Sequence, residues 1–477
     1  MNTITLTAIL GWPIFGLLIY ASQKDPKRGA ILSILIGFLF LPSGVGFDLP
    51  GLPAIDRDNI VALTLLGALL FGGKVKMPLK VGVGFYMLAI LIYIVSPVLT
   101  AMTNGDSLVV GERVLRGMQA YDGLSIAFGE LLELAPLFIG YWLITSVRDQ
   151  RMMLTMIVVA GLCYSLLLIV EIRLSPQIHK WVYGFHPATE IGSARGDYYR
   201  PKAFLTNGLI AAFFTLTVVI AAVAIWRDDR IRMMQGMDRL ARLKPRWFGF
   251  AAVYLTMILV ISQSLGALVF GLAVIPAMIM LKPRTQLWVA VIITTIAFSY
   301  PILRSLDLVP HESLVEGAAA ISERRAESLE ARFYNEGRLL ERGLERPMLG
   351  WGNWGRNRIY DSRGVDRTLS DGYWVIILGT RGIIGYLANY IVFVAPIYLF
   401  WLQSRRQKKM EVSPITAGIC LTLSVNFLDF VPNAPLTPLT WLFIGALLRH
   451  IKENATVTAE AAAPVSAAAP PRRRTVL

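Results

Sequence analysis

The stretch "TITLTAILGWPIFGLLIYA", residues 3–21, decides the class of fold. It carries no charged side chain, and a charged segment follows it at residues 22–29. A helix of about 20 apolar residues is long enough to cross the hydrocarbon core of a bilayer. The stretch has no basic leader, so we interpret it as a membrane span and not as a cleavable signal peptide.

Similar apolar runs recur along the whole chain of 477 residues, in which 55% are hydrophobic and 16% are charged. This composition predicts an all-α, polytopic helical membrane protein, with about 12–13 transmembrane helices. The predicted spans are 3–21, 29–45, 58–73, 80–102, 124–146, 151–172, 203–226, 246–262, 264–281, 285–303, 373–402, 413–432 and 436–450.

The net charge of +14 does not indicate nucleic-acid binding, because many of the basic residues lie in short loops between predicted spans. Alternate loops are basic, for example "SQKDPKRG" and "QSRRQKKM", and such loops stay on the cytoplasmic side. The N-terminus and the long segment 304–372 are therefore expected outside, and the C-terminus inside.

This pattern divides the chain into four parts. We expect N-terminal membrane helices over 1–303, an external loop over 304–372, C-terminal membrane helices over 373–450, and a cytoplasmic tail over 451–477. The tail is rich in Ala and Pro and is expected to be disordered.

The run 373–402 is too long for one straight span. Gly379, Gly382 and Gly385 are expected to break it into a short entry helix and a true span.

The external segment contains one clear helix, "AESLEARFYNEGRLLERGLERPML". Leu329, Phe333, Leu340 and Leu344 recur at helical spacing and form one apolar stripe. Its arginines, Arg338, Arg342 and Arg346, alternate with glutamates, which favours a solvated, ion-paired face. Pro347 is expected to end the helix.

The turn "GWGNWG" follows this helix. Trp351 and Trp354 suit either the membrane interface, where tryptophan is common, or a surface on which sugars stack. Both interpretations, a membrane interface and a sugar-stacking surface, stay open.

Three stretches together resemble the O-antigen ligase and O-antigen polymerase superfamily. The spacing R-x14-P-x2-G-x-G (Arg332, Pro347, Gly350, Gly352) is similar to that family's large external loop. "DGYWVIILGTRGIIG" is similar to its motif of a histidine followed by Gly-x-x-Gly, with Asp371 at the histidine position. "RPKAFLTNGL" resembles its R-x-x-G segment ending in asparagine, with Arg200 and Asn207 matching.

Three positions depart from the pattern of the family. Asp371 replaces the histidine of the enzymes that attach O-antigen to lipid A-core, Gly372 follows it in place of a polar residue, and Ala203 stands where the family favours glycine. The resemblance therefore favours a polymerase, with a ligase as the alternative.

The resemblance implies a glycosyltransferase of the bacterial inner membrane that acts on the periplasmic face. The donor would be a glycan on undecaprenyl diphosphate, the acceptor a sugar hydroxyl on another glycan, and a chain-length regulator a possible partner in the lipid bilayer. No cofactor is implied.

The bond that breaks in this reaction leaves a diphosphate, and arginine suits that charge because its planar fork grips phosphate oxygens in pairs. Arg200 and Arg332 are the predicted clamp, with Arg195 and Asn207 as further substrate-binding candidates. The alternatives are an interfacial anchor for Arg200 and an ion pair with Glu336 for Arg332.

Asp371 is the predicted general base for the acceptor hydroxyl. It also stands just before an apolar helix, where an aspartate caps the first turn. The two roles are compatible.

Glu130 and Glu133 lie one helical turn apart inside a predicted span. Carboxylates there face a cavity or a partner, so these two either line a substrate path or pair with an unseen basic group. Asp429 and Asn426 raise the same question near the end of another span.

Other classes stay open at this point. The cysteines, Cys163 and Cys420, lie in apolar runs and are expected to be buried thiols, and the four histidines show no metal-ligand spacing. The alternatives are a transporter, a scaffold protein of the membrane, and a glycosyltransferase with an acidic first external loop. That loop holds Asp48, Asp56 and Asp58.

Overall fold

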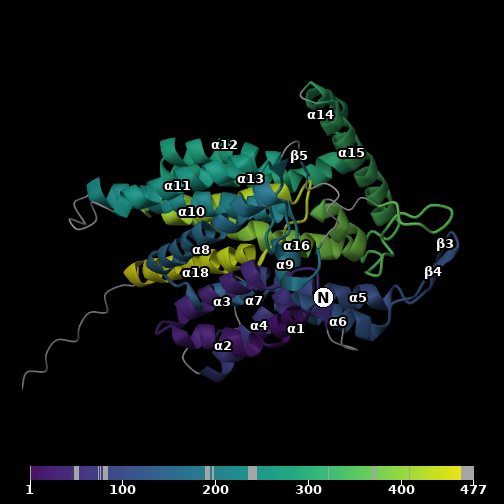
Figure 1. The fold of residues 1–477 in the computed structure, drawn as a ribbon, viewed down its shortest axis with the longest axis horizontal. Helices are drawn as coiled ribbons and strands as arrows, with labels where there is room; N and C mark the ends of the chain where they lie inside the picture. Colours follow the sequence, from purple (N-terminus) through teal and green to yellow (C-terminus); the bar gives the residue numbers. More distant parts are fainter. Residues whose placement is uncertain are drawn as a thin grey trace, which may run out of the picture.

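A computed structural model describes residues 2–47, 53–72, 75, 77–78, 84–187, 194–195, 198–234, 244–320, 322–368, 372–407 and 409–462. These residues form a bundle of helices that run roughly parallel or antiparallel, with three two-stranded hairpins (Figure 1). The chain is an all-α polytopic membrane protein, as the apolar runs predict.

Every predicted span coincides with a helix or a pair of consecutive helices. The helices are α1 (Thr3–Leu10), α2 (Trp12–Ser22), α3 (Pro26–Phe40), α4 (Arg57–Gly72), α5 (Gly84–Met102), α6 (Ala120–Glu133), α7 (Ala135–Leu143), α8 (Val147–Leu174), α9 (Ile178–Tyr183), α10 (Gly208–Met234), α11 (Lys244–Ile261), α12 (Leu265–Met280), α13 (Pro283–Ser305), α14 (His311–Ala319), α15 (Glu323–Leu344), α16 (Tyr373–Arg406), α17 (Pro414–Asp429) and α18 (Pro438–Ala462).

The strands form three short antiparallel hairpins between helices. They are β1 (Gly46–Phe47) with β2 (Ile55–Asp56), β3 (Leu108–Val110) with β4 (Arg113–Leu115), and β5 (Ala194–Arg195) with β6 (Tyr198–Tyr199).

Six of the described helices are long and apolar enough to cross a bilayer, or seven if the bent pair α1–α2 is one span. Three more apolar helices, Arg246–Ile261, Leu265–Met280 and Pro414–Asp429, are shorter than 18 residues. The total of 12–13 crossings stays a prediction.

Helix α10 lies at the centre of the bundle. It is apolar on all sides, and 83% of its most apolar window is buried. Small residues let its neighbours approach closely: Gly161 of α8 meets Val218, and Gly418 of α17 meets Ala224. Membrane helices commonly associate through such small residues.

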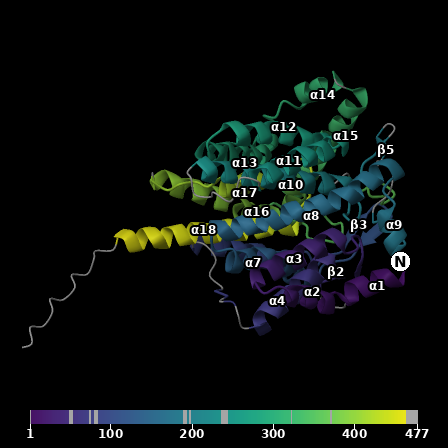
Figure 2. The same ribbon diagram turned by 60° about the vertical axis from the view of Figure 1, so that its left-hand side comes forward.

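The two ends of the bundle differ. One end, which we call the loop end, carries α9, α14, α15 and the β3–β4 hairpin, whereas α18 finishes at the opposite end (Figures 1 and 2). The N-terminus lies at the loop end, because the Asn2 amide donates to the Val182 carbonyl (2.8 Å) beside α9. The predicted grouping of the N-terminus with segment 304–372 is therefore confirmed.

Three predictions from the sequence differ from the structure. Helix α18 continues to Ala462, so residues 451–462 are helical and not disordered. Cys163 is exposed on α8, and only Cys420 is buried. In the predicted apolar stripe of α15, Leu340 is buried, whereas Leu344 is exposed.

Candidate functional site

Most of the predicted site residues lie at the loop end. Asp371 falls outside the described residues, and for Arg195 only the backbone of β5 is described. Asp48 of the first loop also lies outside the described residues. The other candidates can be placed.

A buried carboxylate shapes the loop that carries Arg200. Glu171 at the end of α8 is fully buried. It accepts hydrogen bonds from the backbone N–H groups of Lys202 (2.8 Å), Ala203 (2.6 Å) and Ile178 (3.1 Å). Three such bonds fix the turn that follows Arg200.

Ala203 in this turn has a φ of 48°. That region favours glycine, because a Cβ is strained there. The glycine that the resembled family places at this position is thus explained by the backbone, and the alanine here adopts the same turn.

Arg200 and Arg332 come from different parts of the chain and lie within electrostatic range of the same carboxylate. Arg200 donates to the hydroxyl of Ser264 (2.9 Å) at the start of α12. Asp429, the last residue of α17, is 1% exposed and lies within electrostatic range of both guanidinium groups. Its Oδ1 accepts a hydrogen bond from Asn433 (2.7 Å).

Arg332 lines a small cavity of about 200 Å³ between α15 and the membrane helices. Tyr300 of α13, Gly372, and Val431 and Pro432 after α17 also line it. The cavity has room for several atoms beside a permanent positive charge, which suits a phosphate group.

Glu336, the predicted partner of Arg332, contacts the membrane helices. It accepts hydrogen bonds from Arg304 (3.0 Å) and Tyr300 (2.9 Å) of α13 and from Trp374 (3.3 Å) of α16. Burial raises the pKa of Glu336, and these donors oppose that rise. The acid therefore docks α15 on the membrane helices, and it lines the small cavity together with Arg332.

The glycine motifs meet in space. Helix α16 is broken at Gly382, whose φ is 63° and ψ −170°, as the sequence predicts. The turn after α15 is held to this break by backbone hydrogen bonds from Trp351 to Gly379 (2.8 Å), from Gly352 to Thr380 (2.9 Å) and from Ile383 to Pro347 (2.7 Å). The two family-like motifs are thus two halves of one junction.

Gly382→Ala should break this junction. A Cβ at Gly382 would lie 2.4 Å from the carbonyl carbon of Met348, in a backbone conformation that L side chains rarely adopt. We expect a loss of about 1–3 kcal/mol in the free energy of unfolding, measured by thermal or denaturant unfolding in detergent. Gly317→Ala is the control, because nothing lies within 4 Å of a Cβ on that α14 glycine. An equal effect of both substitutions would contradict the junction.

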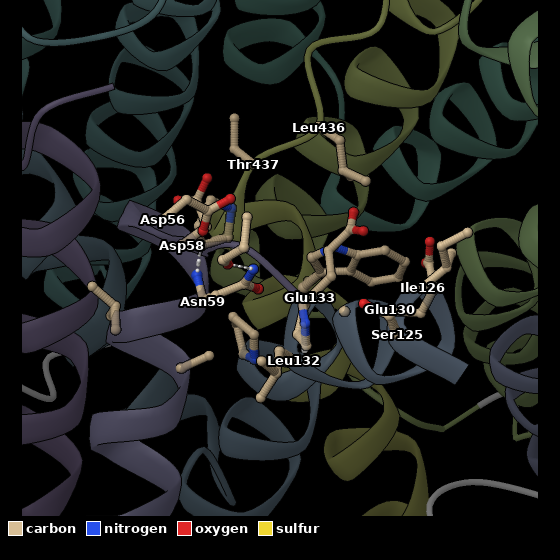
Figure 3. Close-up of a pocket in the computed structure, with 18 of the residues that line it drawn as sticks. Asp56, Asp58, Asn59, Ser125, Ile126, Glu130, Leu132, Glu133, Leu436 and Thr437 are labelled. Atoms are coloured by element: carbon tan, nitrogen blue, oxygen red, sulfur yellow. Dashed lines mark hydrogen bonds between the residues drawn. The ribbon is translucent and has the colours of Figure 1, made fainter. Parts of the chain in front are cut away.

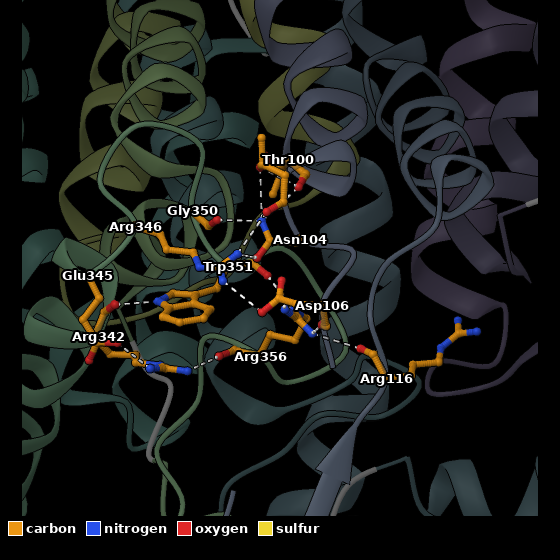
Figure 4. Close-up of polar contacts among 11 residues, drawn as sticks. Thr100, Asn104, Asp106, Arg116, Arg342, Glu345, Arg346, Gly350, Trp351 and Arg356 are labelled. Carbon is orange, nitrogen blue, oxygen red and sulfur yellow. Dashed lines mark hydrogen bonds and ion pairs between the residues drawn. The ribbon is translucent and has the colours of Figure 1, made fainter. Parts of the chain in front are cut away.

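Trp351 is structural and belongs neither to a membrane interface nor to a sugar surface. It is 6% exposed and lies between the guanidinium groups of Arg342 (3.5 Å from the ring centroid) and Arg346 (4.3 Å). Its Nε1 donates to the Arg342 carbonyl (2.7 Å). These two arginines are therefore not a solvated face of α15 (Figure 4).

Arg346 reaches across to Asp106 (3.1 Å), after α5, and to Asn104 (2.6 Å). Burial of Asp106 acts to raise its pKa, but hydrogen bonds from the backbone and Arg346 and the charges of Arg346 and Arg356 hold the pKa below its usual value. This ion pair ties the external segment to α5.

Arg356 is a structural residue that the sequence analysis missed. Its side chain is fully buried. It donates to the carbonyls of Asp106 (2.8 Å), Arg116 (3.0 Å) and Trp351 (3.3 Å) (Figure 4). Only the arginine-rich composition of the stretch signals it, because two of its three partners, Asp106 and Arg116, lie at least 240 positions earlier in the chain.

Asn207 has a structural role at the start of α10. Its side-chain oxygen accepts from the backbone N–H of Ile210 (3.0 Å), which caps the first turn of α10. Its side chain is exposed. This contact explains an asparagine at the position without a substrate.

Of the two predicted alternatives for Glu130 and Glu133, pairing with a basic group is confirmed for Glu130, and a substrate path stays a prediction. Glu130 forms a buried ion pair with Arg381, which precedes the break in α16. Both glutamates also line a large cavity of about 700 Å³, and Asp56 and Asp58 of the first external loop line it too (Figure 3). Trp354, which is 53% exposed, lies at the same cavity.

No group of three or more His, Cys, Asp or Glu residues within the described ranges is placed to hold a metal ion. No family model matches the chain, and no curated protein matches it. The site must therefore be interpreted from its own geometry.

Proposed function

We propose that this protein is a membrane glycosyltransferase that joins lipid-linked oligosaccharide units into a longer polysaccharide. In this proposal the donor glycan is carried on undecaprenyl diphosphate, and the reaction takes place at the loop end, on the periplasmic face of the bacterial inner membrane.

The observation that carries the proposal is the convergence of Arg200 and Arg332. They come from the loop before α10 and from α15, yet both act on Asp429, and Arg332 lines a cavity at the junction with the membrane helices. Two permanent charges at a bundle end are costly unless they have a counter-charge or an anionic ligand. A polyprenyl diphosphate brings its anionic group to this depth.

The chemistry follows from the leaving group. When the bond between the anomeric carbon and the diphosphate breaks, negative charge grows on the diphosphate oxygens, and fixed guanidinium groups stabilise that charge without reorganising. In this proposal the negative charge of Asp429 balances part of the charge of the two arginines until the donor arrives. Asp371 is the proposed base that takes the proton of the acceptor hydroxyl; the next residue, Gly372, lines the same cavity as Arg332.

The product separates a polymerase from a ligase. The purified protein, given only lipid-linked repeat units, is expected to make a ladder of products that differ by one repeat. A single addition to a separate lipid or protein acceptor, with no ladder from repeat units alone, would show that the ligase alternative is right.

A further inference from the structure

The large cavity beside α4, α6 and α7 is separate from the arginine site. Its volume of about 700 Å³ is typical of small-molecule sites. One part of its wall is apolar and includes Phe38, Leu65 and Ile139, and another part is formed by carboxylates. Asp56 and Asp58 lie across the cavity from Glu130 and Glu133 (Figure 3).

More acidic than basic side chains line the cavity. Five acids line it, and three of them have arginine partners: Asp58 pairs with Arg57, Asp122 with Arg116, and Glu130 with Arg381. Asp56 and Glu133 have no ion-pair partner among the described residues.

One buried oxygen in the cavity wall lacks a hydrogen bond within the described part of the chain. Glu130 is 7% exposed, and while its Oε1 binds Arg381, its Oε2 accepts no hydrogen bond there. A buried acceptor of this kind is costly unless a ligand or water donates to it. Sugar hydroxyls and ammonium groups are such donors, whereas phosphates and carboxylates are not.

The mouth of the cavity offers an aromatic surface. Trp354 is half exposed and is held in a left-handed backbone conformation with a φ of 62°. The guanidinium of Arg116 lies 5.0 Å from its ring centroid. The negative face of an indole attracts the partly positive C–H groups of a sugar ring.

The large cavity and the arginine site share one chain segment. Val431 and Pro432 line the small cavity beside Arg332, and Leu436, Thr437 and Pro438 line the large one. A ligand in each would lie beside this segment.

We infer that the large cavity binds the acceptor glycan and that it takes uncharged or amino-bearing sugars in preference to acidic ones. The assignment to the acceptor rests on the proposed function, because the anionic donor belongs at the arginines. The selectivity rests on the cavity itself, where carboxylates repel uronic acids and phosphorylated sugars.

The test is binding of the full-length protein in nanodiscs to a panel of oligosaccharides of equal length that are neutral, amino-bearing or uronic. Neutral and amino-bearing chains should bind at least about tenfold more tightly than uronic ones. Trp354→Ala should weaken neutral binding by about tenfold, and Trp181→Ala, at an equally exposed tryptophan of α9, should not.

A variant that lacks two of the cavity's carboxylates tests the selectivity, because it should gain affinity for uronic chains. In Asp56→Asn/Glu133→Gln, uronic chains should bind about as well as neutral chains bind to the same variant. Glu312→Gln, at an exposed glutamate of α14, should keep the wild-type preference. Equal binding of uronic and neutral chains by wild type, no binding of any chain, or an unchanged preference in the charge variant would overturn the inference.

The two proposals can fail separately. The expected binding pattern without any glycan transfer would leave the cavity assigned and remove the proposed function. Glycan transfer without a preference against uronic chains would keep the proposed function and remove the inference about the cavity. Arg332→Ala should abolish transfer and leave neutral-glycan binding unchanged.

Discussion

Arg332→Lys is expected to lower glycan transfer by about a hundredfold, nearly as much as Arg332→Ala, although lysine keeps the charge. A lysine ammonium is a single point of charge and cannot grip two diphosphate oxygens at once, so the fork of the guanidinium is what the reaction needs. The measurement is the initial rate of transfer from a lipid-linked oligosaccharide by purified protein, at substrate concentrations above and below KM.

Arg338→Ala is the matched control, because Arg338 lies on the same helix, is exposed, and contacts only the ring of Tyr334 among the described residues (5.9 Å). It should keep near-full activity. Arg342 would be a poor control, since it stacks on Trp351 and supports the turn. If Arg332→Ala and Arg338→Ala were tolerated equally, Arg332 would have no part in the reaction.

Arg356→Ala is expected to destabilise the external segment by about 3 kcal/mol or more. The substitution empties the space of a fully buried side chain and leaves the carbonyls of Asp106, Arg116 and Trp351 without their donor. The loss should be local, so hydrogen exchange of residues 345–368 should accelerate while the membrane helices stay protected.

Arg358→Ala provides the comparison. Arg358 lies two positions away, is half exposed, and pairs with Asp366 (2.6 Å). An exposed pair contributes up to about 1 kcal/mol, so exchange should change little. Equal acceleration in both variants would contradict the role given to Arg356.

Local patterns in the sequence account for much of the fold. Apolar runs predict the helices because a bilayer demands about 20 apolar residues per span. The glycines of "LGTRGIIG" predict the break at Gly382, and the spacing of Leu329 and Phe333 predicts α15. Each of these features is decided by residues close together in the chain.

The partners of charged residues could not be predicted in this way. Glu130 pairs with Arg381, 251 positions away, and Arg346 pairs with Asp106, 240 positions away. Such pairs depend on which helices lie side by side, and one sequence does not contain that information. The misreading of Trp351 has the same origin, since the arginines that cover it look solvated when the helix is considered alone.

One sequence also could not predict which site residues come together in space. The spacing of its motifs singled out Arg200 and Arg332, but not that both would lie within electrostatic range of Asp429. Nor could it show that Asp56, Asp58, Glu130 and Glu133 enclose one cavity, because they come from two separate segments.

The central claim is transfer of a glycan from a polyprenyl diphosphate, and release of that diphosphate tests it most directly. Purified protein in nanodiscs would receive a lipid-linked oligosaccharide as its only substrate, and free undecaprenyl diphosphate would be measured against glycan length. We expect one diphosphate released for each bond formed, with release lost in Arg332→Ala and retained in Arg338→Ala. No release above the protein-free rate, even after a separate glycan acceptor is added, would contradict the account.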